Sequence, residues 1–136
     1  MTSIRESSMG ITVLIVEDDQ AIAELLAQVL TYATPYDILE VPDASQALAV
    51  VTFRTPSLFI LDYQLPDMSG LELSDHLHRM EELETVPTVL MSANLPSRQA
   101  MWQRHIVPLR KPFEIADLLQ TVETLLPPQD ESLARA

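Results

Sequence analysis

Hydrophobic residues along this chain follow two alternating patterns. Short runs of consecutive apolar residues are typical of strands that are buried on both faces of a sheet. Between these runs, apolar residues recur every three or four positions, as on a helix with one buried face. The clearest helical stripe, in residues 20–31, consists of Ile22, Leu25, Leu26, Val29 and Leu30. The two patterns predict that strands and helices alternate along the chain.

The predicted elements imply an α/β fold. The predicted strands are 11–16, 36–41, 58–61, 86–92 and 107–109, and the predicted helices are 20–31, 44–51, 69–81, 96–105 and 114–126. Asp19 and Asp43 are typical N-cap residues, and Ser69 with Glu72 has the form of a capping box. Pro108 confines the last strand to a sheet edge. Short strand–helix connections imply a parallel sheet with right-handed crossovers and helices on both faces.

The 136 residues fit a single domain with one continuous core. Residues 1–9 are polar and lack a hydrophobic period, so we expect a flexible leader there, a domain over 10–127 and a flexible tail over 128–136. The chain has no cysteine, which excludes disulfides and thiolate chemistry. No apolar run approaches the roughly 20 residues that span a bilayer. These features predict a cytoplasmic protein with no membrane partner.

The chain is strongly acidic, with 20 acidic against 8 basic residues and a formal net charge of −12. Such a charge opposes association with the phosphate backbone of nucleic acids. We therefore expect no direct nucleic-acid partner.

Reactive side chains follow four of the predicted strands. Glu17 and Asp18 follow the first strand, Asp62 the third, Ser92 the fourth and Lys111 the fifth. The carboxyl ends of parallel strands share one edge, where open α/β sheets bind ligands. Three carboxylates suit a hard, oxygen-preferring divalent cation such as Mg²⁺. A hydroxyl and an ammonium beside them suit a group with several anionic oxygens, and phosphoryl is the best candidate.

Other residues with reactive or large apolar side chains receive ordinary interpretations. His76, His78 and His105 lie away from the acidic residues, so we interpret them as helix or loop histidines and not as metal ligands. Met101 and Trp102 are expected to cover the core, because large apolar residues are usually buried. The alternative is that they form a partner surface.

Four segments resemble the receiver domain of two-component response regulators. They are Val13–Asp19 (VLIVEDD), Leu61–Gly70 (LDYQLPDMSG), Val89–Ala93 (VLMSA) and Lys111–Phe113 (KPF). The resemblance spans residues 11–126. It implies a flavodoxin-like (βα)5 three-layer sandwich, with a five-stranded parallel sheet of order 2-1-3-4-5.

The resemblance also implies a role in phosphorelay signalling. Asp62 would accept a phosphoryl group from a histidine kinase or a histidine phosphotransfer protein and form an aspartyl phosphate. The domain would not be an enzyme acting on other substrates, although it would assist its own phosphorylation and dephosphorylation. Glu17, Asp18, Asp62 and the backbone carbonyl of Gln64 would hold Mg²⁺, with Mn²⁺ as the alternative ion. The phosphorylated protein would then switch its interactions with a downstream protein.

Further residues are assigned roles by the same resemblance. Ser92 and Lys111 would contact phosphoryl oxygens, and the Lys111–Pro112 peptide bond would be cis. Gln64, Ala93 and Asn94 would tune or switch the site.

The chain departs from the family pattern at two positions. Pro108 replaces the aromatic residue that usually moves with the hydroxyl residue, and Arg104 replaces a glycine. We therefore expect the signal to leave through residues 94–98 or through the helix that contains Met101 and Trp102. A homodimer would use the face between the fourth and fifth helices.

Three alternatives remain open. A phosphohydrolase or phosphotransferase acting on small molecules is disfavoured, because Gln64 stands where many such enzymes have a second acid. A receiver-like binding module that works without phosphate is kept open by Pro108. The chain could also be a receiver cut from a larger hybrid kinase or regulator.

Overall fold

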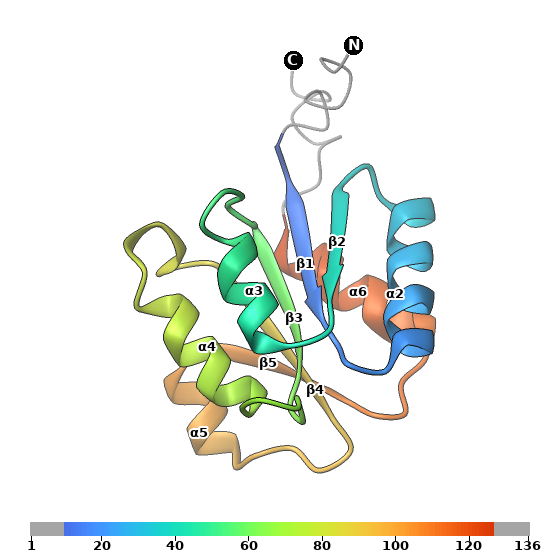
Figure 1. The fold of residues 1–136 in the computed structure, drawn as a ribbon. Helices are drawn as coiled ribbons and strands as arrows, with labels where there is room; N and C mark the ends of the chain where they lie inside the picture. Colours follow the sequence, from blue (N-terminus) through green and yellow to red (C-terminus); the bar gives the residue numbers. More distant parts are fainter. Residues whose placement is uncertain (1–9, 127–136) are drawn as a thin grey trace, which may run out of the picture.

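A computed structural model describes residues 10–126, which form one parallel sheet between two layers of helices (Figure 1). The predicted leader and tail lie outside this range. The strands are β1 (Thr12–Val16), β2 (Asp37–Val41), β3 (Leu58–Asp62), β4 (Thr88–Ser92) and β5 (Ile106–Arg110). All neighbouring strands are parallel and their order is β2-β1-β3-β4-β5, which confirms the predicted topology.

The helices cover both faces of the sheet. They are α2 (Gln20–Ala33), α3 (Ala44–Val50), α4 (Gly70–His78), α5 (Arg98–Gln103) and α6 (Ile115–Leu125), with a short 3₁₀ helix, η1 (Glu81–Leu83), after α4. Figure 1 shows α2 and α6 on one face and α3, α4 and α5 on the other. No helix in residues 10–126 is long and apolar enough to cross a membrane.

Alternation along the buried strands divides the core into two layers. In β1, Val13 and Ile15 contact the α2 and α6 layer, whereas Leu14 and Val16 contact the α3 and α4 layer. Successive residues of a strand point to opposite faces, so a strand covered on both sides is apolar throughout. The three central strands β1, β3 and β4 are buried at every residue, as the continuous apolar runs predicted.

Three helices start as the sequence predicted. The Asp19 carboxylate accepts hydrogen bonds from the amides of Ala21 and Ile22, and Asp43 accepts one from Gln46. Ser69 and Glu72 form a reciprocal capping box at α4. These side chains satisfy amides that have no partner within the first turn of a helix.

Three predictions about the helices were inexact or wrong. Helix α4 ends at His78 and not near Glu81, because Met80 is extended and separates it from η1. Trp102 is 80% exposed and does not cover the core, whereas its neighbour Met101 is buried as expected. The short α5 turns only one narrow face toward the sheet, and consecutive residues of a helix cannot share it. Leu25 of α2 was predicted to belong to the buried stripe of its helix, but it lies at the margin of that stripe and is exposed.

Arg104 and His105 form the turn between α5 and β5. Arg104, where the resemblance led us to expect a glycine, keeps a negative φ, and His105 adopts the left-handed conformation with φ 57°. The Arg104 guanidinium makes two hydrogen bonds to the Asp75 carboxylate, of 2.8 and 3.2 Å. Arg104 therefore links α5 to α4 and needs no left-handed backbone.

We predict that Gly70→Ala destabilises the fold. A Cβ at residue 70 would overlap the carbonyl oxygen of Asp62 and lie 2.9 Å from the Leu90 side chain. Overpacking of this kind costs about 1–3 kcal/mol, whereas helix propensity alone would stabilise the alanine variant by about 0.5–1 kcal/mol. Urea denaturation measures the difference. A free energy of unfolding equal to or above that of the wild type would contradict the close packing of residue 70 on Asp62.

Candidate functional site

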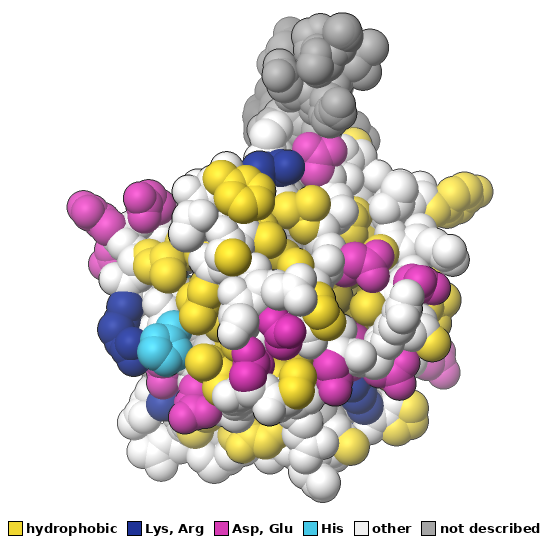
Figure 2. Space-filling model, in the orientation of Figure 1, with side chains coloured by type: hydrophobic (Ala, Val, Ile, Leu, Met, Phe, Trp, Pro, Cys, Tyr) yellow, Lys and Arg dark blue, Asp and Glu magenta, His cyan; other side chains and the backbone are white. Residues whose placement is uncertain are grey.

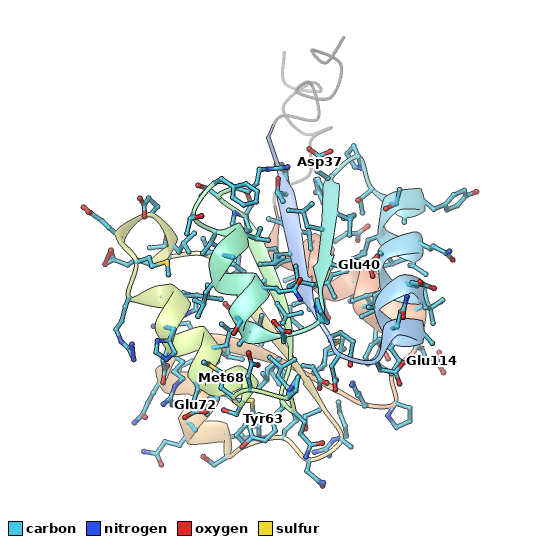
Figure 3. All side chains as sticks on the ribbon, in the orientation of Figure 1. Asp37, Glu40, Tyr63, Met68, Glu72 and Glu114 are labelled. Carbon is cyan, nitrogen blue, oxygen red and sulfur yellow. The ribbon has the colours of Figure 1, made fainter. Side chains whose placement is uncertain are left out.

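The predicted site residues meet at the carboxyl edge of the sheet. In Figure 3, Tyr63 and Met68 mark this edge, and Asp37 marks the opposite end of the strands. A cleft of about 580 Å³ lies there. Its lining includes all of the expected acidic, hydroxyl and ammonium groups, namely Glu17, Asp18, Asp62, Ser92 and Lys111, together with Gln64 and Ala93.

Three carboxylates converge in this cleft. Glu17, Asp18 and Asp62 each present an oxygen within 4.8 Å of the other two. Glu17 and Asp62 are buried, and Asp18 is exposed to solvent. Oxygen donors that are hard, charged and this close together fit a Mg²⁺ ion, and Mn²⁺ accepts the same ligands.

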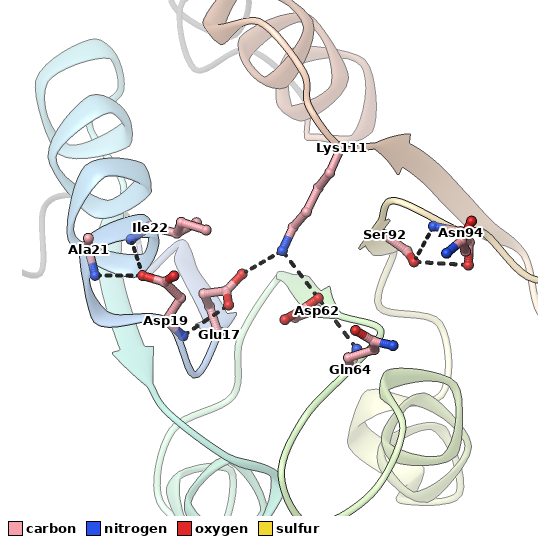
Figure 4. Close-up of polar contacts among 9 residues, drawn as sticks. All are labelled: Glu17, Asp19, Ala21, Ile22, Asp62, Gln64, Ser92, Asn94 and Lys111. Carbon is pink, nitrogen blue, oxygen red and sulfur yellow. Dashed lines mark hydrogen bonds and ion pairs between the residues drawn. The ribbon is translucent and has the colours of Figure 1, made fainter.

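Lys111 joins the two buried acids (Figure 4). Its Nζ lies 3.1 Å from Glu17 Oε1 and 3.3 Å from Asp62 Oδ1. The other oxygen of Glu17 accepts a hydrogen bond from the amide of Asp19, and Asp62 Oδ1 lies 3.4 Å from the amide of Gln64. The Lys111–Pro112 peptide bond is cis. One ammonium thus contacts two of the three carboxylates and offsets only part of the charge of the group.

The ionisation of the buried groups reflects this imbalance. Burial raises the pKa of Glu17 from 4.5 to about 7 against the opposing hydrogen bond from Asp19, and the charge of Asp62 adds to the rise. Lys111 also lowers the pKa of Glu17, but by less than burial raises it. Burial lowers the pKa of Lys111, yet the charges of Glu17 and Asp62 outweigh that effect and the net shift is upward. Lys111 therefore keeps its positive charge.

Ser92 and Asn94 form a closed turn beside the cleft. Ser92 Oγ donates to the carbonyl oxygen of Asn94 at 2.9 Å and accepts from the amide of Asn94 at 3.0 Å. Ala93 and Asn94 are exposed. Pro108 lies outside the cleft, in the exposed middle of β5 opposite Leu90. It lines a separate apolar groove of about 590 Å³ with Met101 and Trp102.

The histidines take no part in this site. His78 contacts Ser74 Oγ and the carbonyl oxygen of Val86 near the opposite end of the sheet. Within residues 10–126, the one group of three or more His, Asp and Glu side chains that could hold a metal ion is Glu17, Asp18 and Asp62.

Two contacts of the site were not predicted. The first is the ion pair between Lys111 and Glu17, residues 94 positions apart. The second is the binding of the Asp67 carboxylate to the first residues of α3, 22 and 23 positions away. A turn signal such as Leu65-Pro66-Asp67 gives no indication of a distant partner, so local sequence could not reveal either contact.

We predict that Glu17 makes stability depend on pH in metal-free buffer. Because the folded state binds the Glu17 proton more tightly than the unfolded chain, this group favours folding below pH 4.5 and loses its contribution as the pH rises through about 7. The free energy of unfolding of the wild type minus that of Glu17→Gln should therefore fall between these pH values. Urea denaturation at several pH values measures it, and a constant difference would contradict the raised pKa.

Comparisons with known proteins agree with this geometry. A family model described as the response regulator receiver domain matches residues 13–123. The phosphate regulon transcriptional regulatory protein PhoB of Pseudomonas aeruginosa is 40% identical over 85 residues, which are 62% of this chain and 37% of PhoB. The polar-differentiation response regulator DivK of Brucella ovis is 27% identical over 121 residues, which are 85% of this chain and 95% of DivK.

A solved structure is similar over the same share of this chain. It is the response regulator TrrA from Thermotoga maritima in complex with Mg²⁺–BeF, with a TM-score of 0.74 and 26% identity, covering 85% of this chain and 99% of TrrA. The chain spans well under half the length of PhoB. Phosphorylation and Mg²⁺ binding are typical of the receiver family, and the acidic cluster is present here. The family match over 13–123, the sheet order and this cluster place the chain in the receiver domain family of two-component response regulators.

Proposed function

We propose that the protein is a phosphoacceptor that receives a phosphoryl group on Asp62 in a Mg²⁺-dependent reaction. The observation on which this rests is the placement of Asp62, whose carboxylate is buried between Lys111 and two further acids in a receiver domain. The donor is a phosphohistidine on a histidine kinase or a histidine phosphotransfer protein. As part of this proposal, the protein acts in the cytoplasm, as the sequence predicted.

The transfer is nucleophilic catalysis by a carboxylate. An oxygen of Asp62 forms a bond to phosphorus while the bond between phosphorus and the histidine nitrogen of the donor breaks and leaves its electron pair on that nitrogen. With a proton on the other ring nitrogen, the donor leaves as a neutral imidazole, and Asp62 becomes an aspartyl phosphate. Glu17, Asp18, Asp62 and the Gln64 carbonyl would hold the cation. Bound there, Mg²⁺ neutralises charge on the phosphoryl oxygens, which is the main source of stabilisation in such transfers.

Lys111 and Ser92 complete the site around the phosphoryl group. Lys111 already faces Asp62 at 3.3 Å, so its ammonium can pair with a phosphoryl oxygen as a point charge. Ser92 must give up its bond to the Asn94 carbonyl before it can donate to the phosphoryl group. Gln64, Ala93 and Asn94 line or flank the cleft and would tune the lifetime of the aspartyl phosphate.

The signal leaves through α5. Pro108 has no rotatable ring and cannot follow Ser92 as an aromatic residue would. The turn at Ser92 leads instead through residues 94–96 to Ser97, the N-cap of α5. Trp102 is 80% exposed on this helix and provides a surface for a downstream partner or for a second copy that would dimerise through α5, β5 and α6.

Pro108 favours a second candidate function, partner binding without phosphorylation. Pro108 occupies the exposed centre of β5, so a module that binds partners without phosphorylation would also fit this chain. The formal net charge of −12, with acidic side chains scattered over the face drawn in Figure 2, argues against nucleic acid as the direct partner of either kind of module.

We predict that acetyl phosphate with Mg²⁺ phosphorylates the wild type but not Asp62→Asn. Intact-mass measurement should show a gain of about 80 Da, the mass of one phosphoryl group. Asp37→Asn is the matched control, because Asp37 begins β2 at the opposite end of the sheet. Failure of the wild type to form an adduct with any phosphodonor would contradict the proposal, as would an equal adduct on Asp62→Asn.

We also predict that the phosphoryl mimic beryllofluoride, added with Mg²⁺, changes the amide NMR shifts of residues 94–102. The change follows from the bonds between Ser92 and the Asn94 backbone, which must rearrange when Ser92 turns toward the cleft. Asp62→Asn should show no change in these residues. Shifts confined to the cleft, with 94–102 unchanged in the wild type, would contradict α5 as the exit.

A further inference from the structure

The loop between β3 and α4 is closed at its base. Gly70 donates its amide to the carbonyl oxygen of Tyr63 at 2.7 Å, and Gln64 pairs with Ser69 in an isolated bridge. The base also lies against the sheet, because the Tyr63 amide binds the carbonyl of Met91. These contacts leave residues 65–68, the apex of the loop, to be held by other means.

Asp67 attaches this apex to the start of α3. Its Oδ1 accepts a hydrogen bond from the amide of Ala44 at 3.0 Å, and its Oδ2 accepts from the amide and the hydroxyl of Ser45 at 2.9 and 3.1 Å. Figure 3 shows the adjacent Met68 beside the same end of α3, and Met68 packs on the core there. Hydrogen bonds from the Ala44 and Ser45 amides hold the pKa of Asp67 below its usual range, so the carboxylate is charged.

The start of α3 has two acidic caps with different connections. Asp43 is the N-cap and accepts a hydrogen bond from the amide of Gln46, in the first turn of the same helix. Asp67 lies in a loop that is distant in sequence, and it accepts hydrogen bonds from the two preceding amides, those of Ala44 and Ser45. Unpaired amides at a helix start favour both carboxylates, but only the contact with Asp67 ties the helix to the loop.

The same junction holds the other acidic loop. The carbonyl oxygen of Val41, at the end of β2, accepts a hydrogen bond from the amide of Glu17 at 3.1 Å. Residues 41–45 thus contact the loop that contains Glu17 and Asp18 on one side and the loop that contains Gln64 on the other. Residues 41–45 therefore support both loops that carry oxygen ligands of the cation site, the one with Glu17 and Asp18 and the one with Gln64.

We propose that Asp67 is a positioning residue for the cation site. It fixes the apex of the β3–α4 loop against residues 41–45 and so sets the place of the Gln64 carbonyl relative to Glu17, Asp18 and Asp62. This inference rests on the proposed function, because that function supplies the need for a cation. Asp67 itself touches neither the cation ligands nor the phosphoryl group; it acts through the loop.

Isothermal titration of Mg²⁺ into the metal-free protein tests this role. Asp67→Ala should weaken Mg²⁺ binding several-fold, up to about tenfold, because Asp67 acts through the loop and the loss of a residue that hydrogen-bonds a metal ligand directly costs about 10–100-fold. Asp67→Asn should lie between, because its amide retains one acceptor oxygen. Asp75→Ala is the matched control: it also removes an acid that links two elements, through two hydrogen bonds from Arg104, but it lies outside the cleft and should leave the Mg²⁺ Kd unchanged.

Phosphorylation kinetics separate positioning from general destabilisation. For Asp67→Ala, the Mg²⁺ concentration that gives half of the maximal rate with acetyl phosphate should rise, while the rate at saturating Mg²⁺ stays near that of the wild type. Thermal unfolding of each variant shows whether it is folded, and Asp67→Asn replaces Asp67→Ala if the latter is not.

Two results would overturn the inference alone: an Asp67 variant with the Mg²⁺ Kd of the wild type, or Mg²⁺ binding by Asp75→Ala that is weakened as much as by Asp67→Ala. A wild type that binds no Mg²⁺ would overturn the proposed function as well, so the two failures are distinguishable.

Discussion

The site is governed by the convergence of three carboxylates at the ends of buried strands. Two of them, Glu17 and Asp62, are almost fully removed from solvent, and burial and the charge of Asp62 both raise the pKa of Glu17. Lys111 supplies one positive charge and contacts both. That charge does not suffice for Glu17, whose pKa remains near 7. The cleft therefore attracts further positive charge, which a proton or a divalent cation can provide.

The sheet makes this unfavourable arrangement possible. β1, β3 and β4 are buried at every residue, and their parallel register brings their last residues to one edge. Asp62 is the final residue of β3 and pairs with Met91, so its backbone belongs to the sheet and not to a mobile loop. Close packing of Gly70 on the Asp62 carbonyl restricts it further. Apolar burial along the strands stabilises the fold enough to tolerate charged groups at their ends.

The features that could be predicted from the sequence are those that depend on interactions between residues close together in the chain or on the topology of the sheet. Strand and helix positions depend on hydrophobic period and on caps such as Asp19, Asp43 and Ser69, which act within a few residues. The meeting of acids at one edge followed from topology alone. In contrast, the Asp67 contact with α3 depends on which way a side chain points across a gap of more than twenty residues. The exposure of Trp102 likewise depends on how α5 is rotated against the sheet, and period gives no information on so short a helix.

The contacts around α5 constrain how a change at the site could spread. Ser92 is bound to the Asn94 backbone as both donor and acceptor, so a rotation of its side chain breaks two bonds of a turn that leads into Ser97. At its other end, α5 is held to α4 by the two bonds from Arg104 to Asp75. A movement that begins at Ser92 would therefore displace the N-terminal end of α5 while its C-terminal end stays attached. Pro108 adds no rotamer change to this motion, so in the proposed mechanism the backbone of residues 93–97 would carry it to α5.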